Sequence, residues 1–337
     1  MQKNHLLLAL LATVGATSVM AQSSVTLYGR VNTSVERQKD GDVTTTGMFN
    51  NASRIGFKGV EDLGGGLKAG FQLEAGFASD TGSGTGWPGL ASGTGINFGR
   101  QSEVNLSGGF GMVRLGNFVP ESYYATADFV SMHNHDTGSS SDALYYDPVW
   151  FGGLGTKNKV GYRSPSLGGL VIDAAVNLHE KAAGTNEKNG FDLAANYNLG
   201  ALALGAGYSY VNSNYQLGLR AAYTFGQFTV GGYYQRNKDD NQWVSGGAGT
   251  RDNFRLSGMY TMGASEFHVN LGHASKWSNV PDSAATQWTL GYNYNLSKRT
   301  KVYGYYTRVN NSAAIAYKAS KLGDDFSSFA VGVRHNF

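Results

Sequence analysis

The chain has 337 residues, carries a net charge of +3 at pH 7 and contains no cysteine. The absence of cysteine excludes a secreted domain stapled by disulfides and any thiolate metal site, and the nearly balanced charge gives no indication of nucleic-acid binding. With 48 glycines, 20 tyrosines and 17 phenylalanines but only five prolines, the composition favours β-sheet with tight turns over disorder.

The first residues have the pattern of a secretory signal peptide. Lys3 is followed by an apolar run at residues 6–12, and Val19-Met20-Ala21 offers a small residue at a cleavage site. The apolar run is too short to span a bilayer. We therefore expect cleavage after Ala21, export from the cytoplasm, and a mature barrel domain over residues 22–337.

The rest of the chain alternates between apolar and polar or small residues along many short segments. In residues 67–77, for example, every odd position is apolar and every even position is polar or glycine. This period of two is the signature of a strand with one apolar face. Sixteen strands are predicted, at residues 24–36, 53–61, 67–78, 96–107, 112–118, 158–164, 170–180, 190–198, 201–210, 214–224, 227–236, 251–262, 265–275, 285–295, 300–309 and 326–337.

The connections between these strands alternate in length. Short glycine-containing turns alternate with polar stretches at residues 37–51, 79–95, 118–158, 237–250 and 310–325. Transmembrane barrels have short periplasmic turns and longer external loops, and a sheet in lipid must close because every backbone group there has to be paired. We therefore predict an all-β fold, a 16-stranded antiparallel transmembrane β-barrel. A soluble β-sandwich is the alternative, but it does not explain apolar faces that end in aromatic residues.

The inner face of the predicted barrel is basic. Residue parity assigns ten bases and four acids to it: Arg30, Arg54, Lys58, Lys68, Arg114, Lys159, Arg163, Arg220, Arg255 and Arg334 against Glu36, Glu74, Asp173 and Asp192. The segment 118–158 has the opposite balance, since Lys157 is opposed by Glu121, Asp128, Asp136, Asp142 and Asp147. If this segment folds inward, its carboxylates face the arginines across the narrowest part of the lumen, where charges tune ion selection.

The last strand ends on an aromatic residue. By parity Phe329, Val331, Val333 and Phe337 face lipid, while Gly332, Arg334 and Asn336 face water. Since an open edge is not viable in lipid, we expect this strand to pair with the first one, at Ser24–Val35.

Four segments resemble Gram-negative general diffusion porins of the type found in β-proteobacteria and Neisseria. They are SVTLYG at residues 24–29, SRIGFKGVEDLGGGLKAGF at 53–71, LSGGFG at 106–111 and VGVRHNF at 331–337. The resemblance implies homotrimers of 16-stranded barrels in the outer membrane, with a third external loop that folds inward and narrows a water-filled channel for ions and small hydrophilic solutes. It also implies contact with outer-membrane lipid and lipopolysaccharide, and a terminal aromatic, Phe337, that signals to the barrel-assembly machinery.

The resemblance also suggests which bases line the constriction. The family places constriction arginines in the motifs that contain Arg54 and Arg100, so these two residues are the first candidates. Arg30 follows by parity alone, and Arg114 is a further base of the inner face. Lys157 lies where some relatives have another basic residue.

Two features complicate this assignment. Val104 is expected to face lipid, and alternate positions counted back from it place Arg100 on the same outer face. A β-bulge between the two residues would be needed to bring Arg100 into the lumen. Many relatives have arginine where this chain has Asn117. Only weak anion selectivity is therefore expected.

Other functions are compatible with a barrel. A barrel lipase needs a nucleophilic serine beside His273 or His335, which have outward parity, but no serine is placed convincingly next to either. An adhesive or structural barrel would act through its loops. His133 and His135 suit a metal site or a pH sensor, although the simpler interpretation is that they are polar loop residues without a specific role. No catalytic residue, cofactor or metal site is predicted.

Overall fold

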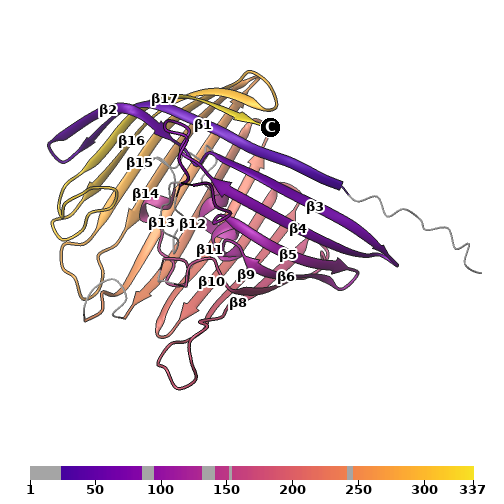
Figure 1. Cartoon of the computed structure of the whole chain (residues 1–337). Coiled ribbons are helices and arrows are strands. Elements are labelled where there is room, and N and C mark those ends of the chain that lie inside the picture. Colours follow the sequence, from indigo (N-terminus) through magenta and orange to yellow (C-terminus); the bar gives the residue numbers. More distant parts are fainter. Residues whose placement is uncertain (1–23, 86–94, 131–140, 152–153, 241–245) are drawn as a thin grey trace, which may run out of the picture.

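The computed structural model describes residues 24–85, 95–130, 141–151, 154–240 and 246–337 (Figure 1). The predicted signal peptide, His133, His135 and Asp136 lie outside these residues, as does the side chain of Asp142. None of the helices in the described ranges is long and apolar enough to cross a membrane.

Antiparallel strands make up most of the described chain and form one closed sheet. Neighbouring strands pair in chain order, and β17 pairs back to β1 (Figure 1). The strands are β1 Ser24–Asp40, β2 Val43–Asn50, β3 Arg54–Gly64, β4 Leu67–Gly76, β5 Gln101–Gly108, β6 Gly111–Asn117, β7 Lys159–Arg163, β8 Leu170–Asn177, β9 Gly190–Leu199, β10 Leu202–Val211, β11 Asn214–Phe225, β12 Phe228–Asp239, β13 Gly249–Met262, β14 Ser265–Ala274, β15 Ala285–Asn295, β16 Thr300–Asn311 and β17 Phe326–Asn336.

The described strands form a 16-stranded barrel, as predicted, because β2 and β3 share one position in the ring. β2 pairs with Thr33–Asp40 of β1 and β3 with Ser24–Arg30. Residues 51–53, between β2 and β3, belong to neither strand, and Ala52 there has a φ of 51°. The prediction of a loop at residues 37–51 is wrong, because β1 and β2 continue there as a hairpin. Apart from Met48, the outward residues here are polar (Arg37, Lys39, Thr44 and Thr46), so no apolar alternation marks the hairpin.

The outer face of the barrel is apolar and the inner face is polar, in agreement with the alternation. On β17, Phe329, Val331 and Val333 are 56%, 54% and 51% exposed, whereas Ser328 and Ala330 are buried. Exposed apolar side chains on a closed barrel are those that lipid covers.

Aromatic rings gather at two levels on this outer face, as an aromatic girdle requires. Near the short turns, successive ring contacts join Tyr223, Phe225, Phe228, Tyr260, Phe267 and Tyr292. Near the longer loops, ring contacts occur among Tyr208, Tyr210 and Tyr215, between Tyr234 and Phe254, and between Trp288 and Tyr306.

The predicted pairing of the last strand with the first is confirmed. β17 pairs with Arg30–Asp40 of β1, and Gly29 and Phe337 exchange both backbone hydrogen bonds, at 3.0 and 3.1 Å. A Cβ on Gly29 would lie 2.4 Å from the Phe337 ring. Glycine at this position therefore lets the terminal ring pack against β1 and close the seam.

Candidate pore constriction

The long connection between β6 and β7 folds into the barrel, as predicted for residues 118–158. It forms the short helices α2 (Glu121–Tyr123) and η1 (Tyr124–Asp128) and the turn η2 (Ser141–Leu144). Figure 1 shows the helices inside the ring of strands. We call this segment the inner loop.

Inner-face side chains of β9 to β13 hold the backbone of the inner loop. The carboxylate of Asp192 accepts from the Glu121 N–H at 2.9 Å. The other bonds run from Arg220 to the carbonyl of Ala125 at 2.8 Å, from Arg251 to Leu144 at 2.6 Å, from Asn253 to Leu144 at 2.9 Å and from Gln235 to Tyr146 at 2.8 Å. The inner loop is therefore fixed along one side of the lumen.

Glycines on β10 make room for the first helical turns. A Cβ on Gly205 would lie 2.2 Å from the carbonyl oxygen of Ala125, and one on Gly207 would lie 2.7 Å from that of Ser122. Ordinary van der Waals contact begins near 3.4 Å, so no side chain fits at either position. The inner loop thus packs directly against the backbone of β10.

The inner loop also has an apolar core of its own. Tyr123 meets Trp150 at 4.7 Å and Tyr145 at 5.2 Å between ring centroids, both edge-on. Edge-on pairs are favourable arrangements for aromatic rings. The buried cluster comprises Val119, Tyr123, Ala127, Val130, Tyr145 and Trp150 of the loop together with Tyr233 of β12.

A ladder of ion pairs anchors the start of the inner loop. Arg114 lies between Glu103 and Glu121, at 2.6 Å from each. Arg163 lies between Glu121 and Asp173, at 2.9 and 2.7 Å. Arg114 is only 7% exposed. Arg114 and Glu121 therefore bind each other directly, whereas the sequence suggested charges that face each other across open water.

Arg54 and Arg100 share one carboxylate on the opposite side of the lumen. Arg100 Nε donates to Glu74 Oε1 at 2.7 Å, and Arg54 Nε lies 3.7 Å from Glu74 Oε2. Tyr28 donates its hydroxyl to the same Oε2 at 3.1 Å. The Arg54 side chain is 32% exposed, against 9% for Arg100. Two guanidinium groups therefore gather around one carboxylate, and Arg54 is the more accessible of the two.

Arg100 faces the lumen without the bulge that the sequence required. The predicted strand 96–107 begins only at Gln101, so parity counted back from Val104 does not extend to Arg100. The Arg100 N–H donates to the carbonyl of Glu74 at 3.2 Å. Its side chain passes over Gly76, where a Cβ would meet the Arg100 Cδ at 3.3 Å.

The Arg30 side chain points inward, but it is hydrogen-bonded to backbone carbonyls and is not exposed to the lumen. It is 4% exposed, and its guanidinium donates to the carbonyls of Asn51 and Ala52 at 3.1 to 3.4 Å. These bonds satisfy the backbone at the break between β2 and β3.

Asn117, which stands where many relatives have arginine, is a tether. Its side-chain amide donates to the carbonyl of Gly99 at 2.8 Å and accepts from the Thr156 hydroxyl. It therefore links the residue before Arg100 to the returning arm of the inner loop.

Asp147 stabilises the fold of the inner loop. It is fully buried and accepts from Val149 N–H at 2.9 Å, from Trp150 N–H at 3.0 Å and from the Ser209 hydroxyl at 2.9 Å. A carboxylate satisfied in this way does not present its charge to the lumen.

Tyr124 and Asp128 are the first and last residues of η1, and Asp128 accepts a hydrogen bond from the Tyr123 hydroxyl at 3.4 Å. Asp128 is half-buried at the end of η1, and Tyr124 is 42% exposed. Tyr124 interacts electrostatically with Asp128, Arg54 and Arg100. Within the described residues, η1 therefore lies across from the arginine cluster.

The inner loop covers several bases that parity correctly places on the inner face. Lys159, Arg220 and Arg255 are 1%, 4% and 4% exposed. Arg251, which the sequence analysis did not select, is also buried and binds the loop. It has the same parity as Arg255 on β13, and this was the signal that could have identified it.

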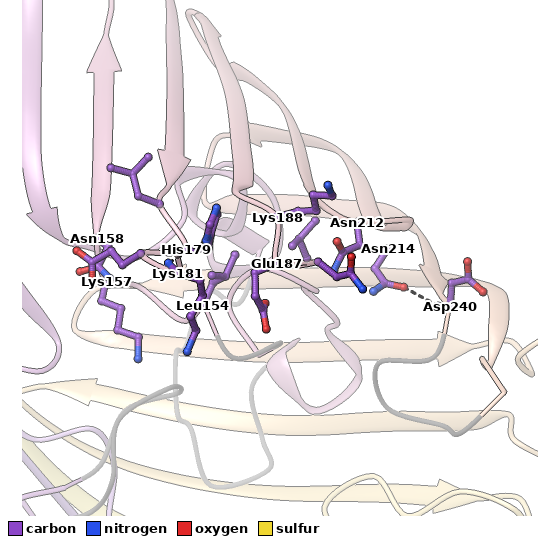
Figure 2. A pocket seen from close by; sticks show the side chains of 14 residues that line it. Leu154, Lys157, Asn158, His179, Lys181, Glu187, Lys188, Asn212, Asn214 and Asp240 are labelled. Atoms are coloured by element: carbon purple, nitrogen blue, oxygen red, sulfur yellow. Dashed lines mark hydrogen bonds between the residues drawn. The ribbon is translucent and has the colours of Figure 1, made fainter. Parts of the chain in front are cut away.

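Lys157 lies at the external mouth and not in the arginine cluster. It lines a cavity of about 780 Å³ between the external loops (Figure 2). The other charged lining residues are Lys181, Lys188, His179, Glu180, Glu187 and Asp240.

Comparison with known proteins agrees with this architecture. A family model described as Gram-negative porin matches residues 7–314. The chain is 32% identical to outer membrane porin protein 32 of Delftia acidovorans and 29% identical to an outer membrane porin protein of Bordetella pertussis, over 100% of both chains in each case. It resembles the solved anion-selective porin from Comamonas acidovorans with a TM-score of 0.75 and 28% identity, covering 94% of this chain and 100% of that chain. The chain therefore belongs to the Gram-negative porin family and forms a passive diffusion channel in the outer membrane.

Proposed function

We propose that the channel is weakly anion-selective and that Arg54 and Arg100 set this preference. The observation that carries the proposal is the cluster of two arginines around one carboxylate, Glu74, with the Arg54 side chain 32% exposed to the lumen. On the inner loop, Glu121 is engaged in ion pairs with Arg114 and Arg163. A fixed positive charge in a narrow lumen raises the local concentration of anions. The anion-selective relative of known structure supports the same sign.

Reversal potentials across planar bilayers in a KCl gradient test this proposal. We expect an anion-side potential for the native channel, a shift toward zero for Arg54→Gln and a shift further to the anion side for Glu74→Gln. Lys68→Gln is the matched control, because it removes an exposed inner-face charge next to a periplasmic turn. A cation-side potential of the native channel, or equal shifts for Arg54→Gln and Lys68→Gln, would contradict the proposal.

We infer that the chain acts as a channel and not as an enzyme. His335 bonds the Thr300 hydroxyl at 2.8 Å, and among the described residues no serine is bonded to His335 or His273. A lipase-like site needs a nucleophile within hydrogen-bond reach of its base. Phospholipid hydrolysis by purified protein that is lost in His273→Ala would overturn this inference.

We also propose that the channel assembles as a homotrimer, in line with its resemblance to general diffusion porins. Light scattering of the detergent-solubilised native protein should give three times the mass of one chain. A monomeric mass at all concentrations would contradict it.

A further inference from the structure

Three aromatic side chains of the inner loop are exposed inside the barrel. Tyr124, Phe129 and Phe151 are 42%, 45% and 38% exposed, although the inner loop lies within the ring of strands (Figure 1). On the outer face of a barrel, lipid covers such side chains. In the lumen they border water instead, and contact with water is unfavourable for apolar surface.

The helix η1 brings two of these rings to one side of the inner loop. Tyr124 is the first residue of this π-helical turn, and Phe129 follows its last residue. A π-helix bonds residues five positions apart, and single turns of it occur frequently at functional sites. Residues 124 and 129 therefore stand one turn apart on the same side of the helix. Apolar surface that gathers in one place and stays exposed marks a site of contact with a ligand or partner. We call Tyr124 and Phe129 the aromatic face.

Packing on the other side holds both rings in place. The guanidinium carbon of Arg220 lies 3.7 Å from the centroid of the Phe129 ring, so a cation covers one face of that ring. The Tyr124 ring lies 5.6 Å from the ring of Tyr123, which packs edge-on against Trp150 at 4.7 Å. Because the rings are ordered before a ligand arrives, less entropy is lost on binding.

The aromatic face lies across the lumen from the arginine cluster. Tyr124 interacts electrostatically with both Arg54 and Arg100. Arg100 is held by Glu74 at 2.7 Å, whereas Arg54 lies 3.7 Å from the same carboxylate and its side chain is 32% exposed. Arg54 is therefore the base that a solute beside Tyr124 can reach.

We propose that the constriction binds single-ring aromatic carboxylates, with the carboxylate on Arg54 and the ring against Tyr124 and Phe129. This inference rests on the anion preference proposed above and names the class of anion. A guanidinium group pairs with a carboxylate through two parallel hydrogen bonds. Aromatic rings attract each other beyond the area that they bury, by offset stacking or by edge-to-face contact. A solute with one negative charge beside one ring matches a base and two rings that border the same passage.

Block of the KCl current through native channels in planar bilayers tests the proposal, with benzoate as the probe and cyclohexanecarboxylate as the ligand control. The two anions have the same charge and similar size, so Arg54, Glu74 and Asp128 act on both alike. Cyclohexanecarboxylate has no π system. Since an aromatic pair adds roughly two- to twelvefold in affinity, we expect benzoate to bind more tightly by a factor in that range, measured as the concentration that halves the mean current.

Variants of the inner loop identify the rings responsible. Tyr124→Leu and Phe129→Leu should each reduce the preference for benzoate, whereas Tyr124→Phe should keep it because the ring remains. The matched control is Phe151→Leu, which removes an exposed ring of the same loop. Phe151 is two residues from Val149, which packs against Gly190 at the first residue of β9. We expect native preference in this variant.

Equal affinity of the native channel for the two anions would overturn the inference while the anion-side reversal potential, and with it the proposed function, stays intact. An equal loss of preference in Tyr124→Leu and Phe151→Leu would also overturn it. Arg54→Gln should weaken both anions by similar factors, and unchanged block in that variant would refute the placement of the carboxylate. Heat resistance of the barrel on gels verifies that each variant is folded.

Discussion

Replacing Gly205 should push the inner loop into the lumen and lower the conductance of the channel. In Gly205→Ala the new Cβ would lie 2.2 Å from the Ala125 carbonyl oxygen, whereas ordinary contact begins near 3.4 Å, so the two must separate by about 1.2 Å. The same Cβ would stand 2.5 Å from the Arg220 guanidinium, which donates to that carbonyl. The helix and its anchor therefore have to move together.

The energy of this clash falls mainly on the inner loop. Overpacking costs about 1–3 kcal/mol, and loss of the hydrogen bond from charged Arg220 adds roughly 1.5–3 kcal/mol. The β10 backbone stays paired with β9 and β11, so the barrel should remain folded. Because β3 lies eight strands from β11 in the ring of sixteen, a helix pushed away from β10 and β11 moves toward Arg54.

Single-channel recording measures the effect directly. We expect conductance to fall in Gly205→Ala and further in Gly205→Val. Gly304→Ala is the matched control, since its Cβ would meet the Ala330 carbonyl at an ordinary 3.4 Å. Native conductance in both Gly205 variants, with a folded barrel, would refute the docking of the inner loop on β10.

Three further predictions concern the loop anchor, the seam and the mouth. Glu121→Gln breaks two ion pairs of the partly buried ladder. Because breaking a buried pair costs about 3–5 kcal/mol, the thermal unfolding midpoint should fall. An unchanged midpoint would contradict the anchoring role of Glu121. Deleting Phe337 removes two backbone hydrogen bonds at the seam and should reduce assembly into the outer membrane while surviving channels conduct normally; native surface levels would count against it. Replacing Lys157, Lys181 and Lys188 with glutamine should lower anion conductance in dilute salt but not at about 1 M, where the Debye length is only about 3 Å; an equal drop in both would assign these lysines another role.

Much of the fold was predictable because each strand carries its own signal. Along β17 the alternation of Phe329, Val331 and Val333 with small or polar residues predicts both the strand and its lipid-facing side. The β1–β2 hairpin was missed for the converse reason. Arg37 and Lys39 stand outward beyond the apolar band, so that part of the strand has no apolar face to recognise.

The candidate site was less predictable, because parity gives the direction of a side chain but not its partners. Arg114 and Arg54 both point inward, yet Arg114 is enclosed between Glu103 and Glu121, whereas Arg54 stays accessible beside Glu74. The direction of the Arg100 side chain could not be predicted from alternation, because Arg100 lies before the first residue of β5, Gln101.

The sequence by itself determined the barrel: local alternation with period two marks each strand, and unpaired edges are excluded in lipid. The tertiary structure decided which charges face the pore. Which charges face the pore depends on where the inner loop packs against the barrel wall. The strands that it packs against are far from the loop in sequence, such as β10 with its glycines and β13 with Arg251. Contacts of this kind leave no periodic pattern in the chain, and they appear only when the sheet has closed.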